Sequence, residues 1–141
     1  MGVSRLRRLF PVKFCPDGFK QVIYNCYKMI LDLKSSNDAR NYCSSIGAKL
    51  AEPRTNVDLR GVRAYLKNRY SQERPIIGGH DTRVSNPGGS WVWLSDNSSI
   101  AYLNWTHIQT KTCLQIESML QKQVLNAVSC SLPFSFLCEA F

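Results

Sequence analysis

Six cysteines are the feature that most restricts how this 141-residue chain can fold. They are Cys15, Cys26, Cys43, Cys113, Cys130 and Cys138. An even number without a C-x-x-C pair is typical of disulfides rather than of a zinc site or a redox motif. The alternative, six reduced thiols in a cytosolic protein, is unusual in so small a chain. We therefore expect disulfide bonds and a secreted, extracellular protein.

The length predicts a single domain. No segment approaches the roughly 20 apolar residues of a transmembrane helix, so we expect no membrane span. The N-terminal MGVSRLRRLFPVKF is basic, but its apolar part is too short for a secretory signal, which indicates a mature or truncated form. We expect a basic N-terminal arm at residues 1–14 and the folded domain at residues 15–141.

The net charge of +8 is concentrated in the first half of the chain. Residues 1–74 contain 15 Lys and Arg against 6 Asp and Glu, whereas the remainder contains 3 against 4. Such a surface attracts polyanions, but it also simply favours solubility. Nucleic acid is not an expected partner, because disulfides indicate a different compartment.

Two segments have the features of helices. The segment SSNDARNYCSSI (35–46) begins with a capping-box pattern and places Cys43 on its apolar face, and Gly47 suits the position after its end. A second cap at Thr55 precedes an apolar stripe at helical spacing. That stripe consists of Leu59, Val62 and Leu66.

A basic stripe runs beside this second apolar stripe. Arg60, Arg63 and Lys67 recur at i, i+3 and i+7 and predict a basic helix face. Such a face can dock an acidic partner, although a solvated helix face has the same pattern.

Strand patterns dominate the rest of the chain. One strand is predicted early, in VIYNCYKMIL (22–31), and a short one in AKLAEP (48–53). GSWVWLSDNSS (89–99) is predicted to be a strand followed by a turn. The other later candidates are PIIGG (75–79), AYLNW (101–105), TCLQIES (112–118), VLNAVSC (124–130) and FSFLCE (134–139). Helices followed by a run of strands indicate an α+β fold.

In this order, the segments resemble the C-type lectin-like domain. CPDGFKQVIYNC resembles the opening of the long, six-cysteine form of that family. ARNYCSSIGAKLAEP resembles its first helix, and GSWVWLSDNSSIAYLNW its Trp-x-Trp segment. PIIGGHD resembles its core strand, although Ile76 replaces the usual Trp. The resemblance covers residues 15–139 and implies two helices packed on small antiparallel sheets, with a loop-rich second half and three disulfides.

The resemblance also selects among the 15 pairings that six cysteines allow. It implies the bridges Cys15–Cys26, Cys43–Cys138 and Cys113–Cys130. The residues themselves are compatible with this pairing, since Cys15 and Cys26 flank a Pro-Asp-Gly turn.

The oxygen ligands of the family's calcium site are missing. In the family they come from a Glu-Pro-Asn or Gln-Pro-Asp triplet in a long loop, an acidic residue before a cysteine, and a Trp-Asn-Asp motif. Here residues 106–112 contain neither triplet, Lys111 precedes Cys113 where an acidic residue is expected, and only Asn126 of the last motif remains. Because calcium takes six to eight oxygen ligands, we expect no metal at this position and no cofactor. Asp81, Asp96 and Glu117 leave a secondary calcium site open.

The resemblance implies recognition rather than catalysis, so the leading interpretation is carbohydrate binding without calcium. Aromatic stacking and hydrogen bonds from amides and hydroxyls can hold a sugar. The candidate ligand-binding residues are His107, Gln109, Lys111 and Asn126, although each also fits an ordinary loop position. The tryptophans Trp91, Trp93 and Trp105 are expected in the core, as in the family.

Other interpretations remain at this point. The basic helix face can instead bind an acidic protein, a sulfated glycan or a mineral surface, and the chain can form a homo-oligomer. His80, Asp81 and Ser85 lack any motif that positions a nucleophile, so we expect no enzyme. Asn97 and Asn104 begin N-x-[ST] sequons and are glycosylation candidates where exposed.

Overall fold

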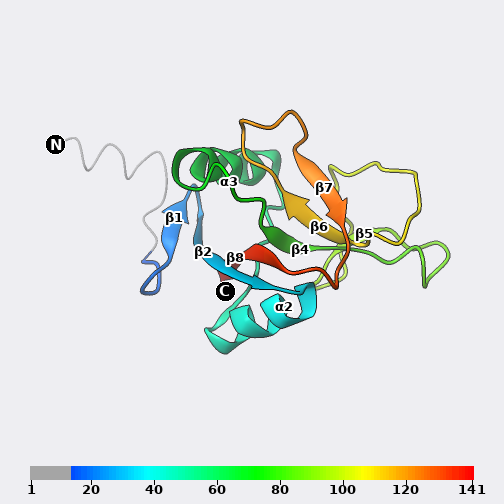
Figure 1. The fold of residues 1–141 in the computed structure, drawn as a ribbon, viewed down its shortest axis with the longest axis horizontal. Helices are drawn as coiled ribbons and strands as arrows, with labels where there is room; N and C mark the ends of the chain where they lie inside the picture. Colours follow the sequence, from blue (N-terminus) through cyan, green and yellow to red (C-terminus); the bar gives the residue numbers. More distant parts are fainter. Residues whose placement is uncertain (1–13) are drawn as a thin grey trace.

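The computed structural model describes residues 14–141, so the predicted arm lies outside the described residues except for Phe14. Within these described residues, two helices and eight strands follow one another (Figure 1). They are β1 (Lys20–Val22), β2 (Asn25–Lys34), α2 (Ser36–Ser45), β3 (Ala48–Leu50), α3 (Asn56–Arg69), β4 (Ile76–Asp81), β5 (Trp91–Trp93), β6 (Cys113–Ile116), β7 (Leu125–Val128) and β8 (Phe134–Ala140).

The strands form one branched sheet with the order β1-β2-β8-β4-β6-β7, in which β3 also pairs with β8 and β5 with β4. All pairings are antiparallel except that of β4 with β8, which joins Ile76 to Phe136. This parallel contact connects the two antiparallel parts of the sheet. The helices α2 and α3 lie on opposite sides of the central strands (Figure 1). The α+β class is therefore confirmed, with one continuous sheet in place of several small ones.

The helix boundaries follow the predicted capping residues. Ser35 Oγ accepts a hydrogen bond from the Asp38 backbone N–H (3.3 Å), and Thr55 Oγ1 accepts one from that of Asp58 (3.1 Å). Each bond satisfies an N–H that has no partner within the first helical turn. Gly47 follows α2 with φ of +74°, a conformation that a residue with a Cβ rarely adopts.

One strand prediction was wrong at its start and one was wrong altogether. Residues 25–31 of the predicted strand 22–31 lie in β2, but Ile23, with φ of +56°, turns the chain between β1 and β2. Residues 101–105 form no strand. Side chains hold this segment instead: Tyr102 donates a hydrogen bond to the Pro53 carbonyl oxygen, and its ring packs edge-on against Trp93. Apolar and aromatic alternation alone does not supply a neighbouring strand.

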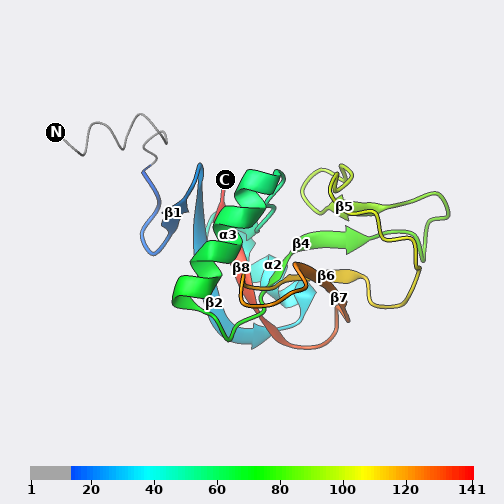
Figure 2. The ribbon, with the colours of Figure 1, turned by 90° about the horizontal axis from the view of Figure 1, so that it is seen from above.

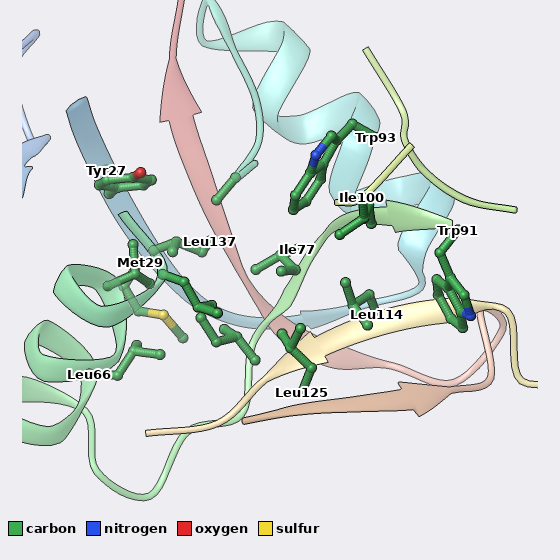
Figure 3. Packing of buried hydrophobic residues seen from close by; sticks show 14 residues of the cluster. Tyr27, Met29, Leu66, Ile77, Trp91, Trp93, Ile100, Leu114, Leu125 and Leu137 are labelled. Atoms are coloured by element: carbon green, nitrogen blue, oxygen red, sulfur yellow. The ribbon is translucent and has the colours of Figure 1, made fainter. Parts of the chain in front are cut away.

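Two apolar clusters fill the space between the sheet and the helices. One lies under α3 and includes Leu66, Ile77, Leu114 and Leu137, with Trp93 at its far end (Figure 3). The second lies under α2 and includes Ile30, Cys43, Ile76, Phe136 and Cys138. Trp91 and Trp93 are buried as predicted. Trp105 is only partly buried, which places part of its ring within reach of a ligand.

The three disulfides are the ones that the family resemblance implies. They join Cys15 to Cys26, Cys43 to Cys138, and Cys113 to Cys130. The second bridge spans 95 residues and ties α2 to the last strand. Such bridges restrict the unfolded chain more than the folded one, which stabilises the fold.

A buried carboxylate joins β3 to the turn after β5. Glu52 is 3% exposed, and its carboxylate oxygens accept hydrogen bonds from Arg54, Lys49 and both the backbone and hydroxyl of Ser95. Burial raises the pKa of Glu52, but these hydrogen bonds outweigh it and leave the pKa below its ordinary value. The charged form of Glu52 therefore stabilises the folded state.

We expect Glu52→Gln to lower the free energy of unfolding by about 2 kcal/mol at pH 7, because a neutral amide replaces a carboxylate that accepts charged donors. The difference in unfolding free energy between wild type and Glu52→Gln is largest above the ordinary pKa of 4.5. It decreases as the pH falls through the lower pKa of Glu52 in the folded state. Urea unfolding at pH 7 and pH 3 measures both. The exposed Asp32→Asn is the control, and an equal loss for both variants would contradict this role.

Candidate ligand-binding site

The segment of residues 101–112, here called the recognition loop, is the second part of the connection between β5 and β6. It projects from the same end of the molecule as the loop after β4, opposite to β1 (Figures 1 and 2). Its far end is fixed to β4, since the Thr112 carbonyl oxygen accepts hydrogen bonds from the Asp81 backbone N–H (2.9 Å) and from His80 Nδ1 (3.0 Å). The Cys113–Cys130 bridge then holds the next residue to the chain beyond β7.

Arg83 anchors the middle of the recognition loop through hydrogen bonds to its backbone. Its Nη1 donates a hydrogen bond to the Trp105 carbonyl oxygen (2.8 Å), and its Nη2 donates one to that of His107 (3.1 Å). The same guanidinium pairs with Asp81, with Nε to Oδ1 at 2.8 Å and Nη2 to Oδ2 at 2.9 Å. One planar side chain therefore connects the end of β4 to two carbonyls of the recognition loop.

The pair is shielded from solvent, because the side chains of Asp81 and Arg83 are 1% and 13% exposed. Hydrogen bonds from Arg83 lower the pKa of Asp81 below its ordinary value, against the opposing effect of burial. The carboxylate therefore stays charged and the bidentate pair stays intact at neutral pH. No local sequence pattern predicts that Asp81 or Arg83 anchors the recognition loop.

An open cavity of about 360 Å³, here called the loop cavity, lies along the recognition loop. It is lined by Trp91, Asn104, Trp105, Thr106, His107 and Gln109. The rings of Trp91 and Trp105 pack edge to face, with their centroids 5.4 Å apart. The loop cavity thus combines an aromatic wall with amide, hydroxyl and imidazole groups, which is the usual composition of a site for a polar, ring-shaped ligand.

The structure brings together only two of the four predicted ligand-binding residues. His107 and Gln109 are exposed and line the loop cavity. Lys111 is exposed beyond that lining. Asn126 lies on β7, where its Nδ2 donates to Gln115 Oε1 (3.4 Å) and its Oδ1 accepts from Gln123 Nε2 (3.3 Å).

Asn126 belongs to a different hollow, here called the sheet cavity. This open cavity has a volume of about 500 Å³. Its polar lining includes Gln72, Arg74, Gln115, Gln121, Asn126 and Ser135. The family motif predicts Asn126 near the recognition loop, whereas strand pairing directs its side chain toward β6.

The three carboxylates considered above as ligands of a secondary calcium site each have an arginine partner. The pairs are Asp81 with Arg83, Asp96 with Arg54, and Glu117 with Arg74. Among residues 14–141, one trio of metal-ligating side chains converges, consisting of His80, Cys113 and Cys130. Both sulfurs are bonded to each other, so this trio offers no thiolate.

The predicted basic face on α3 contains two exposed residues instead of three. Arg60 and Lys67 are exposed. Arg63 turns toward the segment between β6 and β7, where it donates hydrogen bonds to the carbonyl oxygens of Glu117, Ser118 and Gln121 (2.9–3.0 Å). Helical spacing places the three residues on one face, but it does not show which of them the next loop covers.

Both predicted sequons are on the surface. Asn97 is exposed in a turn with φ of +58°. Asn104 is exposed as well, and it lines the loop cavity. A glycan on Asn104 would therefore stand at the mouth of that cavity. Occupancy of either sequon stays a prediction.

We expect Arg83→Lys to lower the free energy of unfolding by about 1–3 kcal/mol, because lysine cannot reproduce the bidentate pair and the two carbonyl bonds. Amide hydrogen exchange at residues 105–109 should rise more than exchange in β4. Urea unfolding and hydrogen-exchange mass spectrometry test this. The exposed Arg60→Lys should change stability by less than about 0.5 kcal/mol. Unchanged exchange in the recognition loop would show that Arg83 does not anchor it.

Comparisons with known proteins agree with this architecture. The C-type lectin mannose-binding isoform of Notechis scutatus scutatus is 29% identical over 134 residues, which cover 89% of this chain and 82% of that protein. One chain of the snaclec coagulation factor IX-binding protein of Protobothrops flavoviridis is 26% identical over 129 residues, which cover 89% of this chain and 99% of that one. The crystal structure of human lithostathine aligns with a TM-score of 0.73 and 25% identity over 90% of each chain.

Neither helix of residues 14–141 has the length and apolar character needed to cross a membrane. The family described as "Lectin C-type domain" matches residues 32–140, which is most of the chain. Together with the three disulfides and the sheet topology, this match shows that the chain belongs to the C-type lectin domain family.

Proposed function

We propose that this domain is an extracellular recognition module that binds carbohydrate in the loop cavity without calcium. The observation that carries the proposal is the position of Arg83. It bonds the carbonyls of Trp105 and His107 and neutralises Asp81. A protein side chain thus supplies the positive charge and the fixed geometry that a metal ion would otherwise bring to the loop.

The lining of the loop cavity supports a sugar ligand. The partly buried Trp105 offers an aromatic surface on which the C–H groups of a pyranose can pack. Asn104, Thr106, His107 and Gln109 offer donors and acceptors for hydroxyl groups. The cavity volume lies within the range of about 300–1,000 Å³ that is usual for small-ligand sites.

The same residues give no support to catalysis. Nδ1 of His80 bonds to the Thr112 carbonyl and Asp81 bonds to Arg83, so these two side chains do not form the His-Asp pair that a nucleophilic serine requires. Three disulfides fit an oxidising, extracellular location. Recognition is thus the function that the described residues support.

We expect binding to immobilised glycans to be equal in calcium and in EDTA, because the loop is anchored by Arg83. Gln109→Ala and His107→Ala should each weaken binding of the retained glycans about three- to tenfold, since each removes a hydrogen-bonding group from the cavity. A glycan array followed by titration of its hits measures both effects. Asn41→Ala, exposed on α2, is the control. Binding that disappears in EDTA would refute metal-free recognition.

A second candidate function is binding of an acidic protein or a sulfated glycan through α3. Arg60, Lys67 and Arg69 are exposed on this helix, and the chain carries a net charge of +8. A relative that aligns with this chain over nearly its whole length is named for binding coagulation factor IX. Protein binding by this chain is therefore the alternative to sugar binding.

Under this second function, heparin should bind to the protein at low ionic strength and dissociate as salt is raised beyond about 0.1 M, because exposed charges are then screened. The double variant Arg60→Gln/Lys67→Gln should weaken binding and flatten the salt dependence, whereas Gln109→Ala should not. Surface plasmon resonance over a salt series separates the two functions. If heparin affinity changed neither with salt concentration nor in the double variant, α3 would not be the heparin-binding surface.

A further inference from the structure

We propose that the sheet cavity is a second carbohydrate-binding site, separate from the recognition loop. The inference rests on the proposed function in one respect, namely that the ligand class of the domain is carbohydrate. The sheet cavity shares no lining residue with the loop cavity. Its walls come from the end of β2, from β6 and β7, from the start of β8 and from the segments that follow α3 and precede β7 and β8.

The observation that carries this inference is an unpaired amide in the wall of the sheet cavity. Gln115 is 4% exposed, so its side chain is almost fully buried. Its Oε1 accepts a hydrogen bond from Asn126 Nδ2, and within the described chain its Nε2 has no partner. The Nε2 atom of Gln115 keeps some contact with solvent, and Gln115 lines the sheet cavity, so we infer that this nitrogen faces the cavity. A buried amide with a free end costs folding free energy unless a ligand or water bonds to it.

Other amides and hydroxyls surround that free end. Asn126 is held beside Gln115 by its bonds to Gln115 and Gln123, so the two amides present a fixed pair. Gln72, Gln121 and Ser135 add further neutral polar groups to the lining. Such groups match the alternating donors and acceptors of sugar hydroxyls.

An apolar strip borders these polar groups. It is formed by Leu33, Pro133 and Phe134, and Leu33 is 65% exposed. A pyranose has one polar edge and one face of C–H groups, so it can satisfy both parts of this lining at once. An exposed leucine beside a row of amides is otherwise an unfavourable contact with water.

The charges of the sheet cavity argue against an anionic ligand. Its single cation, Arg74, pairs with Glu117 at 3.6 Å, and Glu73 adds a negative charge. An extended peptide is also disfavoured at the outer strand β7. The Leu125 carbonyl oxygen there already accepts a hydrogen bond from Gln123 Nε2 (2.7 Å), which removes one acceptor that an added strand would use. A neutral, hydroxyl-rich ligand remains.

The test is an NMR titration of the uniformly ¹⁵N-labelled protein with the methyl glycosides of mannose, galactose and N-acetylglucosamine, each in EDTA. We expect at least one glycoside to shift the side-chain amide signals of Gln115 and Asn126. Gln115→Leu should weaken this binding at least about tenfold, because it removes the free donor. Gln72→Ala, at an exposed position where substitution should change stability by less than about 0.5 kcal/mol, should weaken it about threefold.

A crossed control separates the two sites. Gln109→Ala should change the shifts at residues 104–109 and leave those at Gln115 intact. Glycoside shifts confined to residues 104–109 would overturn the second site while leaving the proposed function standing. Shifts at neither place would overturn both. Shifts of Gln115 caused by a neutral Ala-Ser peptide, but by no glycoside, would reassign the cavity to peptides.

Discussion

The pairing of β8 with three other strands is the constraint on which the rest of this domain depends. β8 lies between β2 and β4, it also pairs with β3, and its Cys138 is bonded to Cys43 of α2. The first and last thirds of the chain meet at this strand. Because β4 is placed by β8, and β5 and β6 by β4, the position of the recognition loop follows from this one pairing. A site built on a frame of this kind can tolerate change in its loops without losing its geometry.

Charge pairing fixes the recognition loop within this frame. Asp81, Asp96 and Glu117 each contact an arginine. Arg83 goes further, since its remaining donors bond to two carbonyls of the recognition loop. A guanidinium can therefore neutralise a carboxylate and position a loop at the same time, because its five donors form a rigid plane.

The two cavities differ in how they are supported. The loop cavity is formed by a connecting segment that two anchors hold, so its shape depends on Arg83 and on the bonds to Thr112. The sheet cavity is formed by paired strands, and its central amides are fixed to each other. Sites on strands are usually more rigid than sites on loops. Two sites of unlike rigidity on one small domain would let it contact a branched or repeated glycan at two points.

Local patterns were enough to determine the helices, most strands, the buried tryptophans Trp91 and Trp93 and, through the family resemblance, the disulfide pairs. These features depend on residues close in the chain or on motifs that stand in order. The family resemblance also predicts, from the residues present, that the usual calcium site is absent. Only the tertiary structure decided that Arg83 anchors the recognition loop, that Arg63 leaves the basic face, and that Asn126 belongs with Gln115. Each of these contacts joins residues more than ten positions apart, and no local pattern encodes the distance between such residues.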